Sequence, residues 1–253
     1  MLVLCYHGVS TTWPDPLAID PERLRWQVAR LLDRGWRPAT FTDAVLAPPA
    51  RRTLAVTFDD GLRSVLELVL PVLDELGAVG TAFVPTAMVD DARTFSWPGV
   101  DRWIGSEHEH ELRGMSWADL AELASAGWEV GSHSATHARL TRLADGPLRA
   151  ELRDSKAEIE ARLGRHCRSI AYPYSDVDDR VAAAARAAGY EAGAAVLPAR
   201  SRRDPMRFPR VPVLSGESRL GHRLHVSRPM RRLQAIRGWP AVQRAARARG
   251  GES

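Results

Sequence analysis

The sequence predicts an α/β protein, a distorted (β/α) barrel with about seven parallel strands in one domain. The first observation behind this prediction is that short apolar segments rich in β-branched residues alternate with segments of helical period, as βα units do. The second is that polar clusters follow three of the strand-like segments, where a barrel carries its active site. The composition is that of an ordinary globular protein, which excludes fibrous and disordered classes.

The elements of the first half are predicted from short runs with clear boundaries. Asp20 and Pro21 are typical of a helix start, as N-cap and first-turn residue, and Gly35 is typical of its end. In chain order we expect a strand at 2–6, a helix from 21 to Gly35, a strand at 53–58, a helix at 62–76 and a strand at 79–84.

The second half repeats the alternation after a long irregular segment at 90–115. Ser116 is the expected N-cap of the next helix. We expect a helix at 116–126, a strand at 128–131, a helix at 145–163, a strand at 169–172, a helix at 179–188 and a strand at 190–196. Beyond Arg200 the periodicity fades, and residues 231–250 are expected to form a basic helix or a frayed tail. We therefore divide the chain into a barrel at 1–215 and a basic C-terminal extension at 216–253.

Charge and cysteine content limit the classes of partner. The net charge is +4, yet from Arg200 onward fourteen arginines face three acidic residues. A solvated tail is the ordinary interpretation, the alternative is weak contact with an anionic membrane surface, and no nucleic-acid partner is expected. Cys5 and Cys167 fit neither a disulfide framework nor a metal motif. No signal peptide or spanning helix is visible, so a cytoplasmic protein is expected, of unknown oligomeric state.

Three polar clusters carry the candidate chemistry. They are Asp59 and Asp60 after the strand at 53–58, His133 and His137 after the strand at 128–131, and Tyr172, Pro173 and Tyr174 at the end of the strand at 169–172. Because the carboxyl ends of barrel strands share one face, the three clusters are expected to meet.

A metal site is one interpretation of these clusters. His133 and His137 are four residues apart, so on a helical turn both imidazoles would face one side. With Asp60 they would form a two-histidine, one-carboxylate set that leaves room for water and substrate. A bound divalent ion can lower the pKa of water to about 7. Alternatively, either aspartate could cap the following helix, and the histidine pair alone is a weak signal because Ser134 stands where metalloproteases have Glu.

Together these residues resemble the polysaccharide deacetylase family, the NodB-homology or carbohydrate esterase 4 type. Thr57-Phe-Asp-Asp-Gly61 is similar to its first motif and His133-Ser-x-x-His137 to its second, and the resemblance extends over residues 2–213. It implies a NodB-like barrel and a zinc or similar divalent ion held by Asp60, His133 and His137. It also implies that Asp59 is the general base and that the main-chain N–H of Tyr174 stabilises the oxyanion.

The sequence departs from the family at two motifs. Ala171 stands where the third motif usually has an arginine that steadies the base, in a form that resembles the branch with poly-N-acetylglucosamine deacetylases, where a pair like Tyr6-His7 also occurs. The late Leu-x-x-His motif, which supplies the general acid, has no clear match, and Arg210-Val-Pro-Val occupies its region. His7 is our leading candidate for the acid, or alternatively a core histidine, and His222 and His225 rank lower.

The predicted function is metal-dependent removal of N-acetyl groups from an N-acetylated sugar or polysaccharide. We expect this glycan to contact Tyr172 and Pro173. Trp97 and Trp103 would line the groove by stacking on sugar rings, unless they are buried in the core of their own loop. Two alternatives stay open, a C–N hydrolase that acts on a small cyclic amide and a non-catalytic glycan-binding relative.

Overall fold

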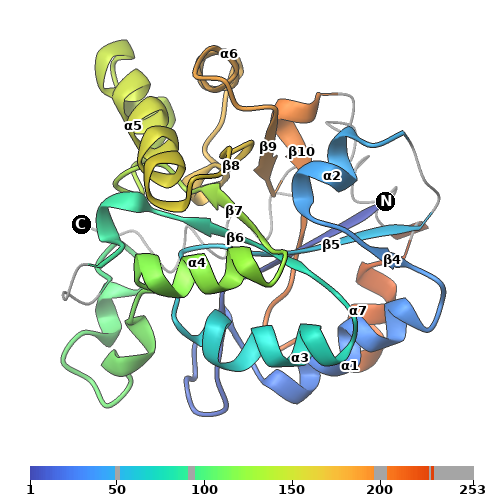
Figure 1. Ribbon diagram of the computed structural model, residues 1–253. Coiled ribbons are helices and arrows are strands. Elements are labelled where there is room, and N and C mark those ends of the chain that lie inside the picture. The colour runs from blue at the N-terminus through green and yellow to red at the C-terminus, as the bar shows by residue number, and fades with distance from the viewer. Residues whose placement is uncertain (49–51, 91–94, 197–203, 228, 231–253) are drawn as a thin grey trace.

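The computed structural model describes residues 1–48, 52–90, 95–196, 204–227 and 229–230 (Figure 1). Within these residues the main sheet contains β1 (Leu2–Tyr6), β4 (Arg37–Pro38), β5 (Thr53–Phe58), β6 (Gly80–Val84), β7 (Glu129–Ser132), β8 (Ser169–Ala171), β9 (Ala192–Ala195), β10 (Phe208–Pro209) and β11 (Val211–Pro212). They lie in the order β10-β9-β8-β7-β6-β5-β1-β11, with β4 beside β5, and all of these pairings are parallel. A separate parallel pair joins β2 (Gly8–Val9) to β3 (Ala18–Ile19).

Helices surround this sheet (Figure 1). They are α1 (Pro21–Leu32), α2 (Phe41–Leu46), α3 (Leu70–Glu75), α4 (Trp117–Ser125), α5 (Asp145–Leu163), α6 (Asp179–Ala187) and α7 (Arg219–His225). Asp20 caps α1 by accepting from the Arg23 N–H at 3.1 Å, and Ser116 and Asp119 form a capping box at α4. The helix starts expected at these residues are therefore confirmed.

The segment Phe208–Pro212 nearly closes the sheet into a barrel. Its first part, β10, pairs with β9, and its last part, β11, pairs with β1 at the other edge. Arg210 is the residue between the two, and its N–H donates to the Ala195 carbonyl at 2.9 Å. The strand order and the surrounding helices confirm the expected distorted (β/α) barrel.

Alternation along the strands separates two apolar layers. Leu2, Leu4 and Tyr6 of β1 belong to the large core under the helices, whereas Val3 belongs to a small cluster with Phe41, Phe83 and Phe208. This small cluster fills the barrel interior, because successive side chains of a strand point to opposite faces. By the same alternation Cys5 and Thr57 face the interior, and so does the position of Asp59.

The structure differs from the sequence prediction in several elements. The helix expected at 62–76 begins with a π-helical turn at Val65–Val69 before α3, because Pro71 has no N–H to continue a regular α-helix. The short elements β4, α2, β10, β11 and α7 are absent from the prediction.

The C-terminal part of the chain is described as far as residue 230, apart from residue 228. Residues of α7 contact α1, so the described part of the expected extension lies against the barrel. The expected basic helix or tail at 231–250 lies outside the described residues. No helix in the described ranges combines the length and the apolar character that crossing a membrane requires.

Candidate active site

Side chains from two strand ends meet at the carboxyl edge of the sheet. Asp60 follows β5, and His133 and His137 follow β7. The Nε2 atoms of His133 and His137 lie 3.4 and 3.3 Å from Oδ1 of Asp60. One ligand atom of each residue lies within 4.8 Å of the others, and all three residues are buried. The residues expected to bind metal are thus neighbours, and their role as ligands stays a prediction.

Left-handed backbone conformations are concentrated around this group. A positive φ angle at a residue other than glycine costs about 1–3 kcal/mol, and such residues cluster at functional sites. Such angles occur at Asp60 (φ 74°), Ser134 (63°), His137 (60°), Tyr174 (57°) and Ser175 (55°).

The helical turn expected to carry the two histidines is wrong. Ser134 and His137 both have left-handed backbone, so residues 133–137 form a tight loop after β7. This loop still turns both imidazoles toward Asp60. Gly61 has a φ of 69°, and a Cβ there would lie 3.0 Å from Cγ1 of Val84, so the Asp-Asp-Gly turn needs glycine.

The ring of His133 is oriented by a hydrogen bond between its Nδ1 and the Ala171 carbonyl at 2.8 Å. In the neutral ring Nδ1 is then the donor, and Nε2 presents its lone pair to the carboxylate of Asp60. The Nε2 lone pair and a lone pair of the Asp60 carboxylate face the same space, and a cation between them would satisfy both. The residues therefore fit a divalent ion held by two imidazole nitrogens and a carboxylate oxygen.

The charges of the group influence one another strongly. Burial opposes ionisation of Asp60, but the imidazoles of His133 and His137, in the form in which their Nε2 atoms carry protons, hold the pKa of its carboxyl well below the usual range. Burial also opposes the charge on His133, yet the carboxylates of Asp59 and Asp60 raise its pKa. Burial prevails at His137 and lowers its pKa. Asp60 is thus an ionised ligand candidate in a buried group of side chains.

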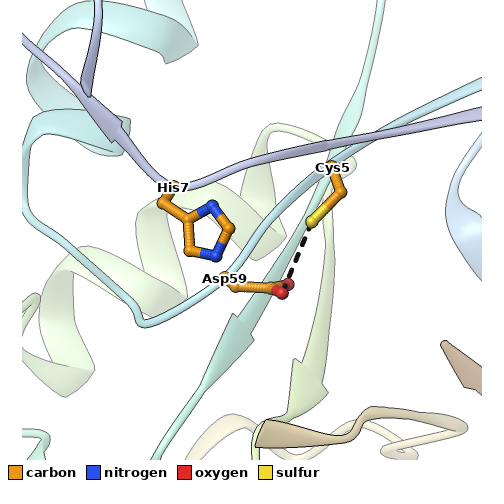
Figure 2. Close-up of side chains that lie close together, drawn as sticks. All are labelled: Cys5, His7 and Asp59. Carbon is orange, nitrogen blue, oxygen red and sulfur yellow. Dashed lines mark hydrogen bonds between the residues drawn. The ribbon is translucent and has the colours of Figure 1, made fainter. Parts of the chain in front are cut away.

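Asp59 has a different set of partners from Asp60. Arg210 donates from Nη1 to Oδ1 and from Nη2 to Oδ2, each at 2.6 Å, and Cys5 Sγ donates to Oδ2 at 3.6 Å (Figure 2). Burial opposes the charged form of Asp59, but the guanidinium outweighs it and lowers the pKa of the carboxyl. The two adjacent aspartates therefore face separate environments, as their predicted separate roles require.

Arg210 is the site residue that the sequence reasoning missed. It is 4% exposed and also donates to Thr57 Oγ1 at 3.0 Å. In the third family motif an arginine usually steadies the base, and Ala171 stands at its position in this chain. Arg210 binds that carboxylate instead, from its position between β10 and β11. The only sequence signal was an arginine in the region of the unmatched late motif.

His7 directly follows β1 and lies beside Asp59 (Figure 2). One ligand atom each from Cys5, His7 and Asp59 lies within 4.8 Å of the others. Both oxygens of Asp59 are already bound by Arg210, and burial raises the pKa of the Cys5 thiol well above its usual value. A second cation there would face a guanidinium and a neutral thiol, so this group is better described as the hydrogen-bonded pair of Cys5 and Asp59 with the candidate acid, His7, beside it.

Aromatic rings enclose His137. The Trp97 ring is stacked on it at 4.3 Å between centroids, and the Tyr174 ring meets it edge-on at 4.7 Å. The guanidinium of Arg139 lies over the other ring, with Cζ 4.0 Å from the centroid of Tyr174. Burial raises the pKa of the Tyr174 phenol to about 12, so it stays neutral near pH 7. Nδ1 of His137 has no hydrogen-bond partner within the described residues, so these rings are its lateral support.

Several expected substrate contacts are better explained by packing. Tyr172 is 1% exposed and donates its hydroxyl to the Met206 carbonyl at 2.9 Å, so the expectation that its side chain contacts the glycan is corrected. Pro173 is buried as well. Trp97 belongs to an apolar cluster of its own loop, and Trp103 packs on this cluster while its Nε1 donates to Asp15 at 2.7 Å. Burial in the loop, the alternative stated for these tryptophans, describes them better.

His222 and His225 contact α1 and Glu217 rather than the aspartates. Nδ1 of His222 lies 3.2 Å from Gln27 Nε2, and Nδ1 of His225 lies 2.9 Å from Glu217 Oε1. Among the candidates for the general acid, His7 is thus the one found beside Asp59.

Residues 47–193 match the family model described as polysaccharide deacetylase, which is more than half of the chain. The chain belongs to the polysaccharide deacetylase family. The Bacillus subtilis (strain 168) protein YxkH, named as a polysaccharide deacetylase, is 25% identical over 207 residues, which are 80% of this chain and 66% of YxkH. The chain thus spans slightly less than two thirds of that relative.

Several solved structures, deacetylases among them, share the fold. The Streptococcus pyogenes deacetylase PplD has a TM-score of 0.74 at 19% identity, over 90% of this chain and 98% of that one. BC0361, a polysaccharide deacetylase from Bacillus cereus, has a TM-score of 0.73 at 22% identity, over 89% of this chain and 68% of BC0361. IcaB from Ammonifex degensii has a TM-score of 0.67 at 23% identity, over 92% of this chain and 96% of IcaB. At these identities the likeness establishes the barrel.

Proposed function

We propose that the protein is a metal-dependent hydrolase that removes N-acetyl groups from an N-acetylated sugar or polysaccharide. Membership in the polysaccharide deacetylase family supports N-deacetylation of a glycan. The observation that carries the proposal is a candidate base, Asp59, next to a buried group of two imidazoles and one carboxylate that suits a divalent ion.

Asp60, His133 and His137 would hold the ion, and zinc suits this mixture of nitrogen and oxygen donors. When bound, such an ion acts as a Lewis acid that polarises the amide carbonyl and makes water easier to deprotonate. The hydrogen bond between His133 Nδ1 and the Ala171 carbonyl would hold the ring with its Nε2 available to the ion.

The remaining roles fall to residues of the chain. Asp59, kept ionised by Arg210, would accept the proton of the attacking water. The main-chain N–H of Tyr174, in the left-handed turn after β8, would donate to the oxyanion that forms from the carbonyl. His7 would donate a proton to the departing nitrogen as the C–N bond breaks. The products are acetate and the free amine.

An acetate-release assay tests this proposal. The purified full-length protein, stripped with a chelator and then supplied with zinc, is incubated with N-acetylglucosamine oligomers and, separately, with small cyclic ureides. We expect acetate from the oligomers only after zinc is restored, and none from an Asp59→Asn variant. Ring opening without acetate release would support the cyclic-amide alternative, and glycan binding without either reaction would support a non-catalytic protein.

A further inference from the structure

A surface on α1 and α7 combines exposed leucines with arginines that form no ion pair in the described part of the chain. Leu220 and Leu224 lie one turn apart on α7, and they are 62% and 50% exposed. They are the most exposed large apolar residues in the described part of the chain. Burying a leucine side chain is favourable, so an adjacent exposed pair favours contact with an apolar phase.

Four arginines flank this pair. They are Arg30 on α1, Arg34 two residues after α1, and Arg219 and Arg223 on α7. None of them forms an ion pair within the described ranges, although many arginines elsewhere do. The guanidinium groups of Arg30 and Arg219 lie 5.8 and 5.3 Å from the Trp26 ring centroid.

The like charges are close enough to act on one another. Lost water contact and then the positive charges of Arg34 and Arg223 lower the pKa of Arg30. The neighbouring Asp33 offsets this only in part. Crowded like charges without carboxylate partners raise the local potential and attract anions.

The surface is attached to the barrel, where α7 lies beside α1 (Figure 1). His222, on the inner side of α7, is 2% exposed and contacts Gln27, whose Oε1 accepts from the Tyr6 hydroxyl at 2.8 Å. Glu217 accepts from His222 and His225 at 3.4 and 2.9 Å. With its inner side fixed in this way, α7 presents Leu220 and Leu224 outward.

We propose that this surface binds an anionic phospholipid bilayer. The leucines would enter the headgroup region, and the lipid phosphates would contact Arg30, Arg34, Arg219 and Arg223. The exposed leucines favour a bilayer over a soluble polyanion, because a polyanion would use the arginines alone. Residues 219–253 contain nine arginines and one acidic residue, Glu252, so the chain continues with the same charge.

Vesicle cosedimentation of the full-length protein tests this proposal. The vesicles consist of phosphatidylcholine alone, or of phosphatidylcholine with one third phosphatidylglycerol. We expect binding to the anionic vesicles that weakens in high salt, and little binding to the neutral ones. Leu220→Ser with Leu224→Ser should weaken binding about 10-fold, and Arg219→Gln with Arg223→Gln about 30-fold.

Two matched controls separate this surface from general effects. Leu68→Ser and Arg153→Gln remove an exposed leucine and an exposed arginine from other elements, and both should bind vesicles like the unaltered protein. All variants should keep the melting temperature and deacetylase rate of the unaltered protein. Equal binding to neutral and anionic vesicles would overturn the proposal. So would undiminished binding by the double serine variant, since the arginines would then serve a soluble polyanion.

Discussion

Arg210 binds both carboxylate oxygens of Asp59 at 2.6 Å, although 151 residues separate the two in the chain. Its backbone lies in the seam where β10 ends and β11 begins, so one residue contributes both to the closure of the barrel and to the orientation of the candidate base. Both side chains are almost fully buried. Removal of one partner of such a pair leaves an unpaired buried charge, which costs about 3–5 kcal/mol.

Arg210→Lys should therefore show whether Asp59 needs only the positive charge of Arg210 or also its pair of hydrogen bonds. Lysine keeps the positive charge but cannot bind both oxygens in one plane. We expect a folded, zinc-binding protein whose kcat for acetate release falls about 10² fold, because the base is misplaced. Arg210→Ala should lower the free energy of unfolding by about 3–5 kcal/mol in a denaturant titration.

The control for this change is Arg207→Lys. Arg207 directly precedes β10 and pairs with the exposed Asp179 at 2.6 Å. It should leave kcat unchanged. An Arg210→Lys enzyme with full kcat would show that Asp59 needs the charge alone.

Metal content should separate Asp60 from Asp59. His133→Ala, His137→Ala and Asp60→Asn each remove a ligand, so the purified proteins should lose most bound zinc and nearly all activity. Asp59→Asn should lose activity but retain zinc, because Asp59 is bound to Arg210 instead. Elemental analysis of each protein measures this. Equal zinc loss in the two aspartate variants would refute the division of roles.

Trp97 should determine how tightly zinc is held. Its ring is stacked on His137 at 4.3 Å, and the Nδ1 of that histidine has no hydrogen-bond partner in the described residues to fix the ring. Trp97→Leu should weaken zinc binding about 10-fold in a chelator competition, since support of a ligand commonly contributes that much. Trp97→Phe keeps an aromatic ring and should bind nearly normally.

Trp103→Leu is the matched control for Trp97. It alters the same loop and breaks the bond to Asp15, but it does not touch His137 in the contacts described. Its zinc affinity should be unchanged. If Trp103→Leu weakens zinc binding as much as Trp97→Leu, the loop as a whole supports the site and the stacked ring has no separate role.

His7→Ala should lower kcat about 10² fold if His7 is the general acid, within the range for such catalysis. The zinc content should stay the same, because His7 belongs to a different group from His133 and His137. The pH–rate curve should lose one limb. Normal turnover per folded molecule, together with a lower melting temperature, would show instead that His7 is a structural histidine.

The site residues that could be predicted are those that lie in short, recognisable stretches of the sequence. Asp60, His133 and His137 each follow a strand whose apolar run is visible in the sequence, and parallel strands bring such ends together. The backbone of the His133–His137 loop was not predictable in this way. Its left-handed residues are Ser134 and His137, neither of them a glycine that would signal the turn.

Arg210 was not predictable because its setting has no local signature. The strands β10 and β11 have two residues each and contain Pro209 and Pro212, so no period of two can be read there. The helix α2 is similar, since Phe41–Leu46 is too short for a helical period and is fixed by the packing of Phe41 in the barrel interior. Tertiary contacts decide such elements.

The stability of the α7 attachment should depend on acid pH through Glu217. Burial favours its protonation, but hydrogen bonds from His222 and His225 lower the pKa of its carboxyl from 4.5 to about 2. The folded protein thus binds this proton less tightly than the unfolded chain, so ionised Glu217 stabilises the fold above about pH 4.5 and this stabilisation is lost as the pH falls toward 2.

In denaturant titrations, the free energy of unfolding of the unaltered protein should exceed that of Glu217→Gln at neutral pH, and the difference should shrink below about pH 4.5. Glu67→Gln, which removes an exposed carboxylate paired with Arg63, should produce a much smaller difference throughout. A Glu217→Gln difference of the same size at every pH would mean that the amide loses packing rather than charge.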